Sequence, residues 1–321
     1  MIGRRRHQER HCIADMSPPF SVKIEHNHAR DTENQRTPAA PLIFASPHSG
    51  NIYPDAFRDM SLLSKTQLRR NEDIWIDALF APCVSRGAAQ LKANFPRSFV
   101  DVNRSADEYI IDENSLQSVL STRSGMSKVA PPHVSARAKV GLGVVPLIIA
   151  ENVPIYAKPP KLADVKARLD ALYFPYHAAL TKLTETVLNA HGRCLLIDCH
   201  SMPGFAPMGA RRADIILGDC HGMSCHPETI DHVERAFKQF GYSVTRNAPY
   251  AGGYVTSHYS RVTDGLETLQ IEINRDLYVN PVTFKKKPGY EKLAFNLNII
   301  IQEIITDFMP DAETDVALAA E

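Results

Sequence analysis

From residue 41 onward, short apolar runs alternate with longer amphipathic segments, and this alternation restricts the possible folds more than any other feature. The short runs predict strands, because they are rich in β-branched or aromatic residues and end at turn-forming residues. They are PLIFAS, AAQLKANF, SFVDVNR, CLLID, ADIILGD, YSVTRN and TLQIEINR. Strands that alternate with helices form one sheet covered on both faces. The expected class is therefore α/β, with a mixed, mainly parallel sheet flanked by helices.

Apolar residues at helical intervals predict the helices between these strands. The helix before CLLID should end at Gly192 and kink at Pro175, because proline lacks a backbone donor and its ring clashes with the preceding turn. The stretch from 105 to 160 mixes Gly, Pro and Ser signals and is too long for an inert loop, so we expect an inserted functional segment. Helices are expected at 61–87, 161–192, 226–241 and 281–308.

The first part of the chain differs from the rest. Residues 1–40 are polar, rich in arginine and histidine, and lack the apolar stretch of a signal peptide, so we expect a flexible arm. Residues 41–310 should form a single catalytic domain with 105–160 inserted in it, and 311–321 should be a tail.

Charge and cysteine content narrow the partners and the compartment. The 36 basic and 36 acidic side chains cancel, so no net field attracts nucleic acid or a membrane surface, and a small-molecule partner is expected. No segment has the roughly 18 uncharged apolar residues of a membrane span. Six cysteines in 321 residues do not form the dense framework of a secreted domain, which favours the cytoplasm.

Three predicted strands carry, at or near their ends, side chains that bind metals or move protons. His48 follows LIFASP, Asp198 and His200 follow CLLI, and Glu272 lies within TLQIEINR. In open α/β sheets the functional crevice lies beyond the carboxyl ends of the strands, so these side chains should meet there. Packing does not explain Glu272, because a buried and unpaired carboxylate is costly.

Two imidazoles and one carboxylate, with a fourth position open, form the ligand set of a catalytic zinc ion. His48 and His200 supply the imidazoles, and a carboxylate from the segment NED can come from the facing helix. Glu272 stays outside that set and is predicted to be the general base. The ligands are dispersed, without a His-Glu-x-x-His helix, so their spacing alone is a weak signal.

Other chemistries find less support. The segment DCHGMSCH (219–226) lacks the distant second half of a zinc knuckle, which disfavours a separate metal site. Cys199 alternates away from His200 along its strand, which disfavours a thiol nucleophile. The chain has no Gly-x-Ser-x-Gly, Walker or Gly-x-Gly-x-x-Gly motif, which argues against serine hydrolases, nucleotide enzymes and dinucleotide dehydrogenases.

Seven blocks are more specific in combination: SPHSGNIYP, NEDIWIDALF, SFVDVNRSADE, DCHSMPG, ADIILGDCHGMSC, PYAGGYVTSHYS and LQIEINRDLYV. In order and approximate spacing, from about residue 41 to 300, the sequence resembles the N-formylglutamate amidohydrolase family. That family is similar to zinc carboxypeptidases and to the aspartoacylase and succinylglutamate desuccinylase enzymes. The resemblance implies a phosphorylase/hydrolase-like α/β fold. It also implies hydrolysis of the amide between an acyl group and an acidic amino acid, such as N-formyl-L-glutamate.

Residue by residue, the resemblance implies that His48 and His200 bind one catalytic zinc ion and that Glu272 is the base. In the carboxypeptidase pattern a ligating glutamate stands three residues after the first histidine, but here Asn51 occupies that position. The acid must come from elsewhere, and we select Asp73, with Glu72 as the rival. Helical periodicity does not separate these two neighbours.

An acidic substrate requires positive charge, preferably a planar guanidinium that pairs with a carboxylate. Arg104 is the first candidate for binding substrate and for stabilising the oxyanion, with Asn103 beside it, because this pair follows a strand and leads into the insert. Arg275 and Arg211, with Arg212 next to it, are candidates for the second carboxylate.

Two further assignments stay open at this stage. Asp198 either orients a ligating imidazole or caps the following turn. Gly252 and Gly253 indicate a close backbone approach beside the site or only a tight turn.

The function also has alternatives. The chain could hydrolyse a different N-acyl amino acid, or it could be a catalytically silent relative that binds a small ligand. A homo-oligomer is also compatible with the sequence.

Overall fold

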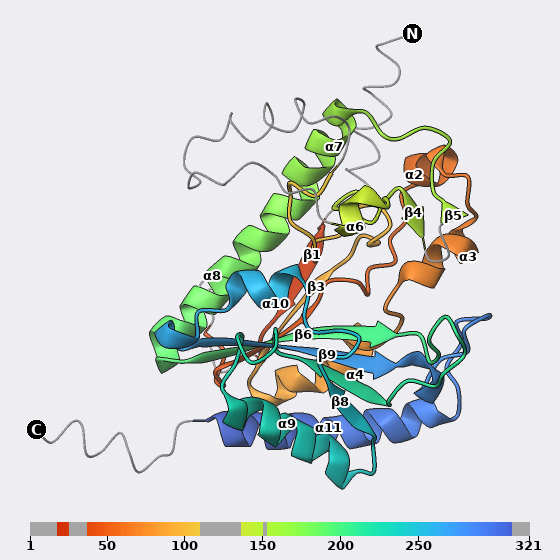
Figure 1. Cartoon of the computed structure of the whole chain (residues 1–321). Coiled ribbons are helices and arrows are strands. Elements are labelled where there is room, and N and C mark those ends of the chain that lie inside the picture. Colours follow the sequence, from red (N-terminus) through yellow and green to blue (C-terminus); the bar gives the residue numbers. More distant parts are fainter. Residues whose placement is uncertain (1–17, 26–36, 110–135, 150–152, 310–321) are drawn as a thin grey trace, which may run out of the picture.

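The computed structural model describes residues 18–25, 37–109, 136–149 and 153–309, which form a central sheet between two layers of helices (Figure 1). The seven-stranded sheet has the order β1-β3-β2-β6-β9-β7-β8. Most neighbours are parallel, whereas β1 runs antiparallel to β3 and β7 antiparallel to β9. The expected α/β class with a mixed, mainly parallel sheet is confirmed. The strands are β1 (Phe20–Lys23), β2 (Leu42–Ser46), β3 (Ala89–Ala93), β6 (Cys194–Met202), β7 (Ile215–Gly218), β8 (Val244–Arg246) and β9 (Leu266–Asn274).

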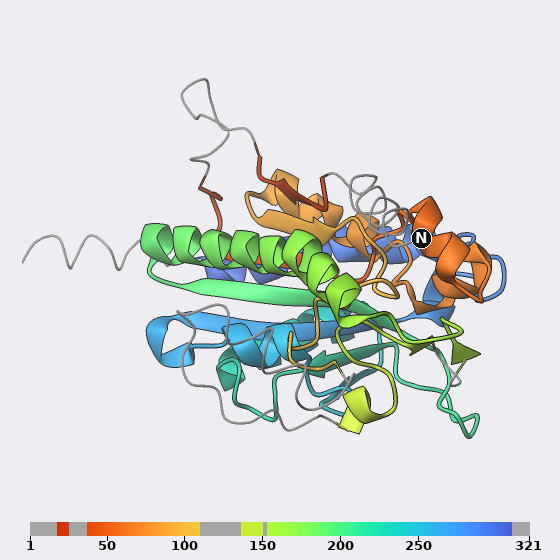
Figure 2. The ribbon, with the colours of Figure 1, turned by 90° about the horizontal axis from the view of Figure 1, so that it is seen from above.

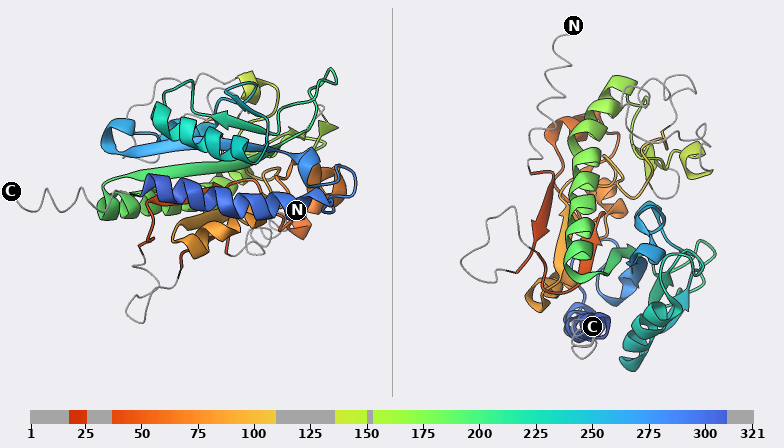
Figure 3. Two further views of the ribbon diagram at one scale, coloured as in Figure 1. Left: turned by 90° about the horizontal axis from the view of Figure 1, so that it is seen from below. Right: turned by 90° about the vertical axis from the view of Figure 1, so that its left-hand side faces the viewer.

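Each face of the sheet carries its own hydrophobic core. Helices α7 (Leu162–Arg168), α8 (Phe174–His191) and α10 (Tyr254–Tyr259) cover one face (Figures 1 and 2). Helices α4 (Ile76–Phe80), α9 (Pro227–Gln239) and α11 (Gly289–Phe308) cover the other, with α9 and α11 side by side (Figure 3). Strands β2, β6 and β9 are buried along their whole length, which explains the apolar runs of β2 and of the first half of β6. The second half of β9 alternates apolar and polar residues, and its polar side chains are buried as well.

Shorter elements connect these layers. None of the helices in the described ranges has the length and apolar character needed to cross a bilayer. The short elements are α2 (Asp55–Met60), α3 (Lys65–Leu68), α6 (Ala136–Lys139), the paired β4 (Ile148–Ile149) and β5 (Val153–Pro154), the 3-10 turns Arg69–Asn71, Ala81–Arg86, Val262–Asp264 and Arg275–Leu277, and the π-helical turn Leu169–Tyr173.

Part of the expected N-terminal arm belongs to the sheet, so treating all of 1–40 as an arm was wrong. Phe20–Lys23 form β1, which pairs with β3 from Phe20 opposite Ala93 to Lys23 opposite Gln90. The strand is only four residues long and lies outside the apolar pattern that begins at residue 41, which is why periodicity missed it. Residues 1–17 and 26–36 lie outside the described ranges.

The predicted helix over 61–87 is broken into short pieces. Glu72 has an extended backbone and Trp75 has a φ of 64°, so helical geometry stops between Arg69–Asn71 and α4. A tertiary hydrogen bond accompanies the break, since the backbone N–H of Asp73 donates to His48 O at 3.0 Å. This contact between distant segments overrides the local helical periodicity.

The structure also bears on three further expectations about single elements. SFVDVNR is not a strand but a series of turns, in which Asp101 Oδ1 accepts a hydrogen bond from the Asn103 backbone N–H at 2.9 Å. The last helix starts at Gly289, not at 281. The long helix ends at Gly192 as expected, and its irregularity is the π-helical turn just before Pro175, where proline cannot supply the regular backbone bond.

The core around β2 should carry much of the stability. Phe44 is fully buried on β2 and lies 5.8 Å from the ring of Phe80. We expect Phe44→Ala to lower the free energy of unfolding by about 3–5 kcal/mol, because it leaves a cavity in a packed interior. Phe295→Ala is the matched control, since that side chain is 66% exposed on α11. Urea unfolding measures both variants, and equal effects would contradict this description of the core.

Candidate metal centre and active site

His48 and His200 come from adjacent positions at one edge of the sheet. His48 follows β2 in the turn after Pro47, and His200 lies near the end of β6. Strands β2 and β6 pair in parallel, so their carboxyl ends coincide. Both imidazoles are buried, and their ring centroids lie 4.7 Å apart. Sheet topology thus brings together two histidines that are far apart in the sequence.

Asp73 completes the group. Its Oδ2 lies 2.9 Å from His200 Nδ1 and 3.4 Å from His48 Nδ1. Ligand atoms of these three buried residues all lie within 4.8 Å of one another. Donors that share a tetrahedral ion at about 2.0–2.1 Å are separated by about 3.3 Å, so a modest adjustment accommodates a metal.

The outer nitrogens of both rings face carboxylates, as expected for metal-binding histidines. His48 Nε2 lies 2.7 Å from Asp101 Oδ1, and His200 Nε2 lies 2.8 Å from Asp198 Oδ1. Protons on these Nε2 atoms leave the Nδ1 lone pairs directed at the centre. His48 Nδ1 is buried and has no hydrogen-bond partner in the described part of the chain. The residues present therefore fit a metal ion, and the short distance to His200 favours the reading in which Asp198 orients an imidazole.

Electrostatic interactions favour the ionised forms of Asp73 and His200. Burial alone would raise the pKa of Asp73, but the hydrogen bond from His200, the nearby imidazole of His48 and the charge of Arg275 hold it well below its usual value. Burial alone would lower the pKa of His200, but Asp198 and Asp73 raise it well above its usual value. A cation that binds here therefore replaces a proton on His200, so metal binding should be coupled to proton release.

Glu72, the rival of Asp73, has a different environment. Its Oε1 accepts a hydrogen bond from Tyr53 Oη at 2.7 Å, and its Oε2 accepts one from Arg69 Nε at 3.0 Å. Burial raises the pKa of Glu72 despite these contacts. The structure brings Asp73, and not Glu72, to the two histidines.

Glu272 lies beside the metal group without belonging to it. It is opposite His200 in the parallel pairing of β6 and β9 and is 6% exposed. Gln270 Nε2 donates to its Oε1 at 2.6 Å, whereas its Oε2 is buried without a hydrogen-bond partner among the described residues. Burial raises the pKa of Glu272 to about 7. A carboxyl group with such a pKa can both accept and donate a proton near neutral pH.

A cavity of about 190 Å³ opens onto these groups. Its wall is strongly polar and contains several arginines. The lining residues are His48, Arg70, Asn71, Asp73, Arg97, Asn103, Arg104, Arg137, His200, Ser201, Pro203, Tyr250, Gly252, Gly253, Gln270, Glu272 and Arg275.

The predicted substrate-binding residues have different positions. Arg104 lines the cavity, and so does Arg275, which donates to Asp73 Oδ1 at 2.9 Å and so supports the metal group. Asn103 Nδ2 donates to Asp198 Oδ2 at 3.0 Å, and its Oδ1 accepts from the backbone N–H of Val255, so its side chain is engaged within the protein.

Two further arginines and two glycines complete the comparison with the expectations. Arg211 is exposed, pairs with Asp214 at 3.0 Å and is not part of the cavity wall. Arg212 is not part of the wall, and its guanidinium donates to the backbone oxygens of Pro203 and Phe205. A Cβ at Gly253 would lie 2.5 Å from the Asn103 side chain, so the close-approach reading of the glycine pair is confirmed.

Sequence reasoning missed several residues in or next to the cavity. Asp101 lies inside the DVNR block, but its role depends on a turn that was expected to be a strand. Arg97 pairs with Asp101 at 2.7 Å, and its buried Nε has no hydrogen-bond partner among the described residues. Arg137 reaches the cavity from the short helix α6 and Tyr250 from a loop, and no periodic pattern reveals the position of either segment.

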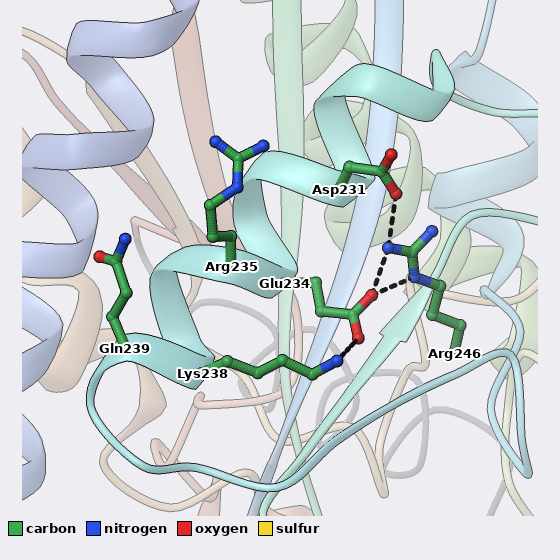
Figure 4. A pocket seen from close by; sticks show the side chains of 6 residues that line it. All are labelled: Asp231, Glu234, Arg235, Lys238, Gln239 and Arg246. Atoms are coloured by element: carbon green, nitrogen blue, oxygen red, sulfur yellow. Dashed lines mark hydrogen bonds and ion pairs between the residues drawn. The ribbon is translucent and has the colours of Figure 1, made fainter.

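Other clusters do not form comparable sites. Within the described residues, the side chains of 219–226 do not form a group whose ligand atoms converge on one point. Cys199 is buried and burial raises the pKa of its thiol well above the usual value, so it is a poor nucleophile. A surface hollow over α9 is lined by charged residues whose ion pairs largely satisfy one another, as between Arg246 and Asp231 (Figure 4).

The fold and the site together define an α/β protein with a candidate mononuclear metal centre at the carboxyl ends of its central strands. A family model for N-formylglutamate amidohydrolase matches residues 40–279. The chain therefore belongs to the N-formylglutamate amidohydrolase family.

Named relatives agree with this membership. N-formylglutamate deformylase of Pseudomonas putida is 24% identical over 273 residues, covering 83% of this chain and 91% of the relative. The Pseudomonas aeruginosa protein of the same name is 25% identical over 245 residues, covering 75% and 82%. The crystal structure of N-formylglutamate amidohydrolase from Ralstonia eutropha has a TM-score of 0.76 and 30% identity, covering 90% of this chain and 98% of that one. A gene product of Agrobacterium tumefaciens shares the fold, with a TM-score of 0.62 at 17% identity and coverage of 90% and 95%.

The Asp101 carboxylate should strengthen metal binding through His48. We expect Asp101→Asn to weaken zinc affinity about 10–100-fold, because such outer partners fix the tautomer and raise the basicity of the ligand. Asp231→Asn, on the surface of α9, is the control (Figure 4). Competition with a chelator at fixed pH measures the affinities. An unchanged affinity in Asp101→Asn, with the fold intact, would exclude this role.

Proposed function

We propose that this protein hydrolyses the N-formyl amide of an acidic amino acid such as N-formyl-L-glutamate, giving formate and glutamate, with one zinc ion as cofactor. One observation carries the proposal: three buried donors converge on a point beside Glu272, a carboxyl group left outside the set and facing the same cavity. Family membership and the two named deformylases add support.

His48, Asp73 and His200 would hold the metal. Two neutral imidazoles and one carboxylate suit zinc, and three protein ligands leave a position for substrate or water. A bound divalent ion would polarise the amide carbonyl and lower the pKa of water close to 7. The remaining chemistry falls to the protein.

Glu272 would act as the general base. Its Oε1 is held by Gln270, which leaves Oε2 to take the proton of the attacking water and to deliver it to the leaving nitrogen. Arg97 offers its unpartnered Nε to the negative charge that develops on the carbonyl oxygen. Arg104, half-buried in the cavity wall, would bind the α-carboxylate of the substrate, and Asn103 would position the surrounding loop.

The cysteines bear on the cell compartment, and the cavity volume bears on the size of the acyl group. The five described cysteines are free, which fits a reducing cytoplasm, where we place the protein. The small volume of the cavity favours a small acyl group over a longer one.

Substrate and base can be tested together. We expect zinc-loaded protein to hydrolyse formyl derivatives of glutamate or aspartate faster than acetyl or succinyl derivatives. Glu272→Gln should keep one zinc per chain but lose at least about a thousandfold in kcat, because the amide cannot accept a proton. Formate release and metal analysis give the two readouts. Full turnover by Glu272→Gln would remove Glu272 from the mechanism, and inactivity of the zinc-loaded wild type on every derivative would contradict the proposed reaction.

The raised pKa of Glu272 also predicts the pH dependence. Only the carboxylate can act as base, so kcat/KM should fall about tenfold per pH unit below the pKa of this group. That pKa is about 7 in the metal-free protein, and a bound cation favours the carboxylate, so the fall should begin at or below pH 7. Rates measured from pH 4 to 9 with metal content checked at each point would give the profile. A rate that is still constant at pH 4 would contradict this role.

A further inference from the structure

The arginines of the cavity wall differ in how their charges are neutralised. Arg97 faces Asp101 at 2.7 Å, and Arg275 faces Asp73 at 2.9 Å, so each has a carboxylate partner. Arg104 instead donates to two backbone oxygens.

Among these arginines, Arg137 has the charge that neighbouring groups neutralise least. Its exposed side chain lines the cavity, and no hydrogen bond or ion pair joins that side chain to a residue in the described ranges. The cavity therefore has two guanidinium groups, Arg104 and Arg137, that are not paired with a carboxylate there.

One residue of the insert fixes the two arginines relative to each other. Leu142 O accepts a hydrogen bond from Arg104 Nε at 3.2 Å, and the Leu142 backbone N–H donates to Arg137 O at 2.9 Å. Ala138, next to Arg137, is 4% exposed and anchors the short helix α6. Arg137 is thus held at the cavity by packed backbone, although its side chain is exposed.

The proximity of these charges is unfavourable without an anion. Burial lowers the pKa of Arg104, and the nearby charges of Arg97 and Arg137 lower it further, which Asp101 and Glu108 only partly offset. Like charges that face one cavity repel each other, and a bound anion removes that repulsion. Two planar guanidinium groups suit two carboxylates, because each can form paired charge-assisted hydrogen bonds.

We propose that Arg137 is a specificity-determining residue that binds the side-chain carboxylate of the substrate while Arg104 binds its α-carboxylate. This inference rests on the proposed function and assigns the residue that would distinguish an acidic amino-acid derivative from a neutral one. The position of each carboxylate in the substrate decides which arginine would bind it. The α-carboxylate is bonded to the carbon that carries the scissile nitrogen, so it would bind the more buried Arg104. The side-chain carboxylate lies further from the reacting carbon and reaches the exposed one.

The test separates charge recognition from turnover by measuring binding. In the Glu272→Gln background with zinc bound, calorimetry gives the Kd of N-formyl-L-glutamate and of N-formyl-L-glutamine, which differ only in the side-chain carboxylate. We expect Arg137→Gln to weaken binding of the glutamate derivative about 10–100-fold and to change binding of the glutamine derivative less than about twofold. Arg137→Lys, which keeps the charge without the planar fork, should lie between. Arg235→Gln is the control, since Arg235 is exposed on α9 in the separate surface hollow (Figure 4).

Two results would overturn the assignment. Equal losses for both ligands would mean that Arg137 binds a group they share, and no loss for either would mean that another residue binds the side-chain carboxylate. Activity of the otherwise wild-type protein is assayed in parallel. If that protein binds N-formyl-L-glutamate in an Arg137-dependent manner but does not hydrolyse it, the specificity proposal holds and the proposed reaction fails.

Discussion

The two oxygens of the Asp73 carboxylate have different partners, and the site depends on this division. Oδ1 accepts hydrogen bonds from Ser201 and Arg275, both at 2.9 Å, whereas Oδ2 faces His48 and His200. One side of the carboxylate is therefore fixed by the protein and the other is directed at the metal position. Replacing Asp73 would leave the guanidinium and both imidazoles without their shared counter-charge in a buried environment, which costs several times more than the loss of a surface ion pair.

The group of Asp73, His48 and His200 can be buried because further polar side chains contact it and packed strands hold these side chains in place. The imidazoles contact Asp101 and Asp198, and Asp101 in turn pairs with Arg97. Strands β2, β6 and β9 hold these groups at one edge, and close-packed cores on both faces limit their movement. Buried charges are tolerated when each has a partner, so some of the buried polar atoms that have no partner among the described residues are informative. His48 Nδ1, Glu272 Oε2 and Arg97 Nε all belong to cavity residues, and each has a chemical role in the proposed reaction.

The sequence identified the residues whose position depends on regular strands. His48, His200 and Glu272 follow from the apolar runs that become β2, β6 and β9, because the ends of parallel strands must meet. The sequence did not identify the residues whose positions depend on tertiary contacts. The choice of Asp73 over Glu72 depends on the backbone bond to His48 O, and the role of Asp101 depends on turns where a strand was expected. Arg211 was a suitable residue type for binding a carboxylate, but it lies outside the cavity. Arg137 lines the cavity, but it lies in a segment without a periodic sequence pattern.

Strand β1 has a consequence for how the chain can be shortened. It occupies the outer side of β3, whose backbone groups would otherwise be open to any other extended peptide. A domain limit drawn at residue 41, where the apolar pattern begins, would remove this protective strand while leaving the metal group complete. Such a shortened chain would keep His48, Asp73 and His200 but expose the backbone hydrogen-bonding groups of β3, so it should self-associate through that edge.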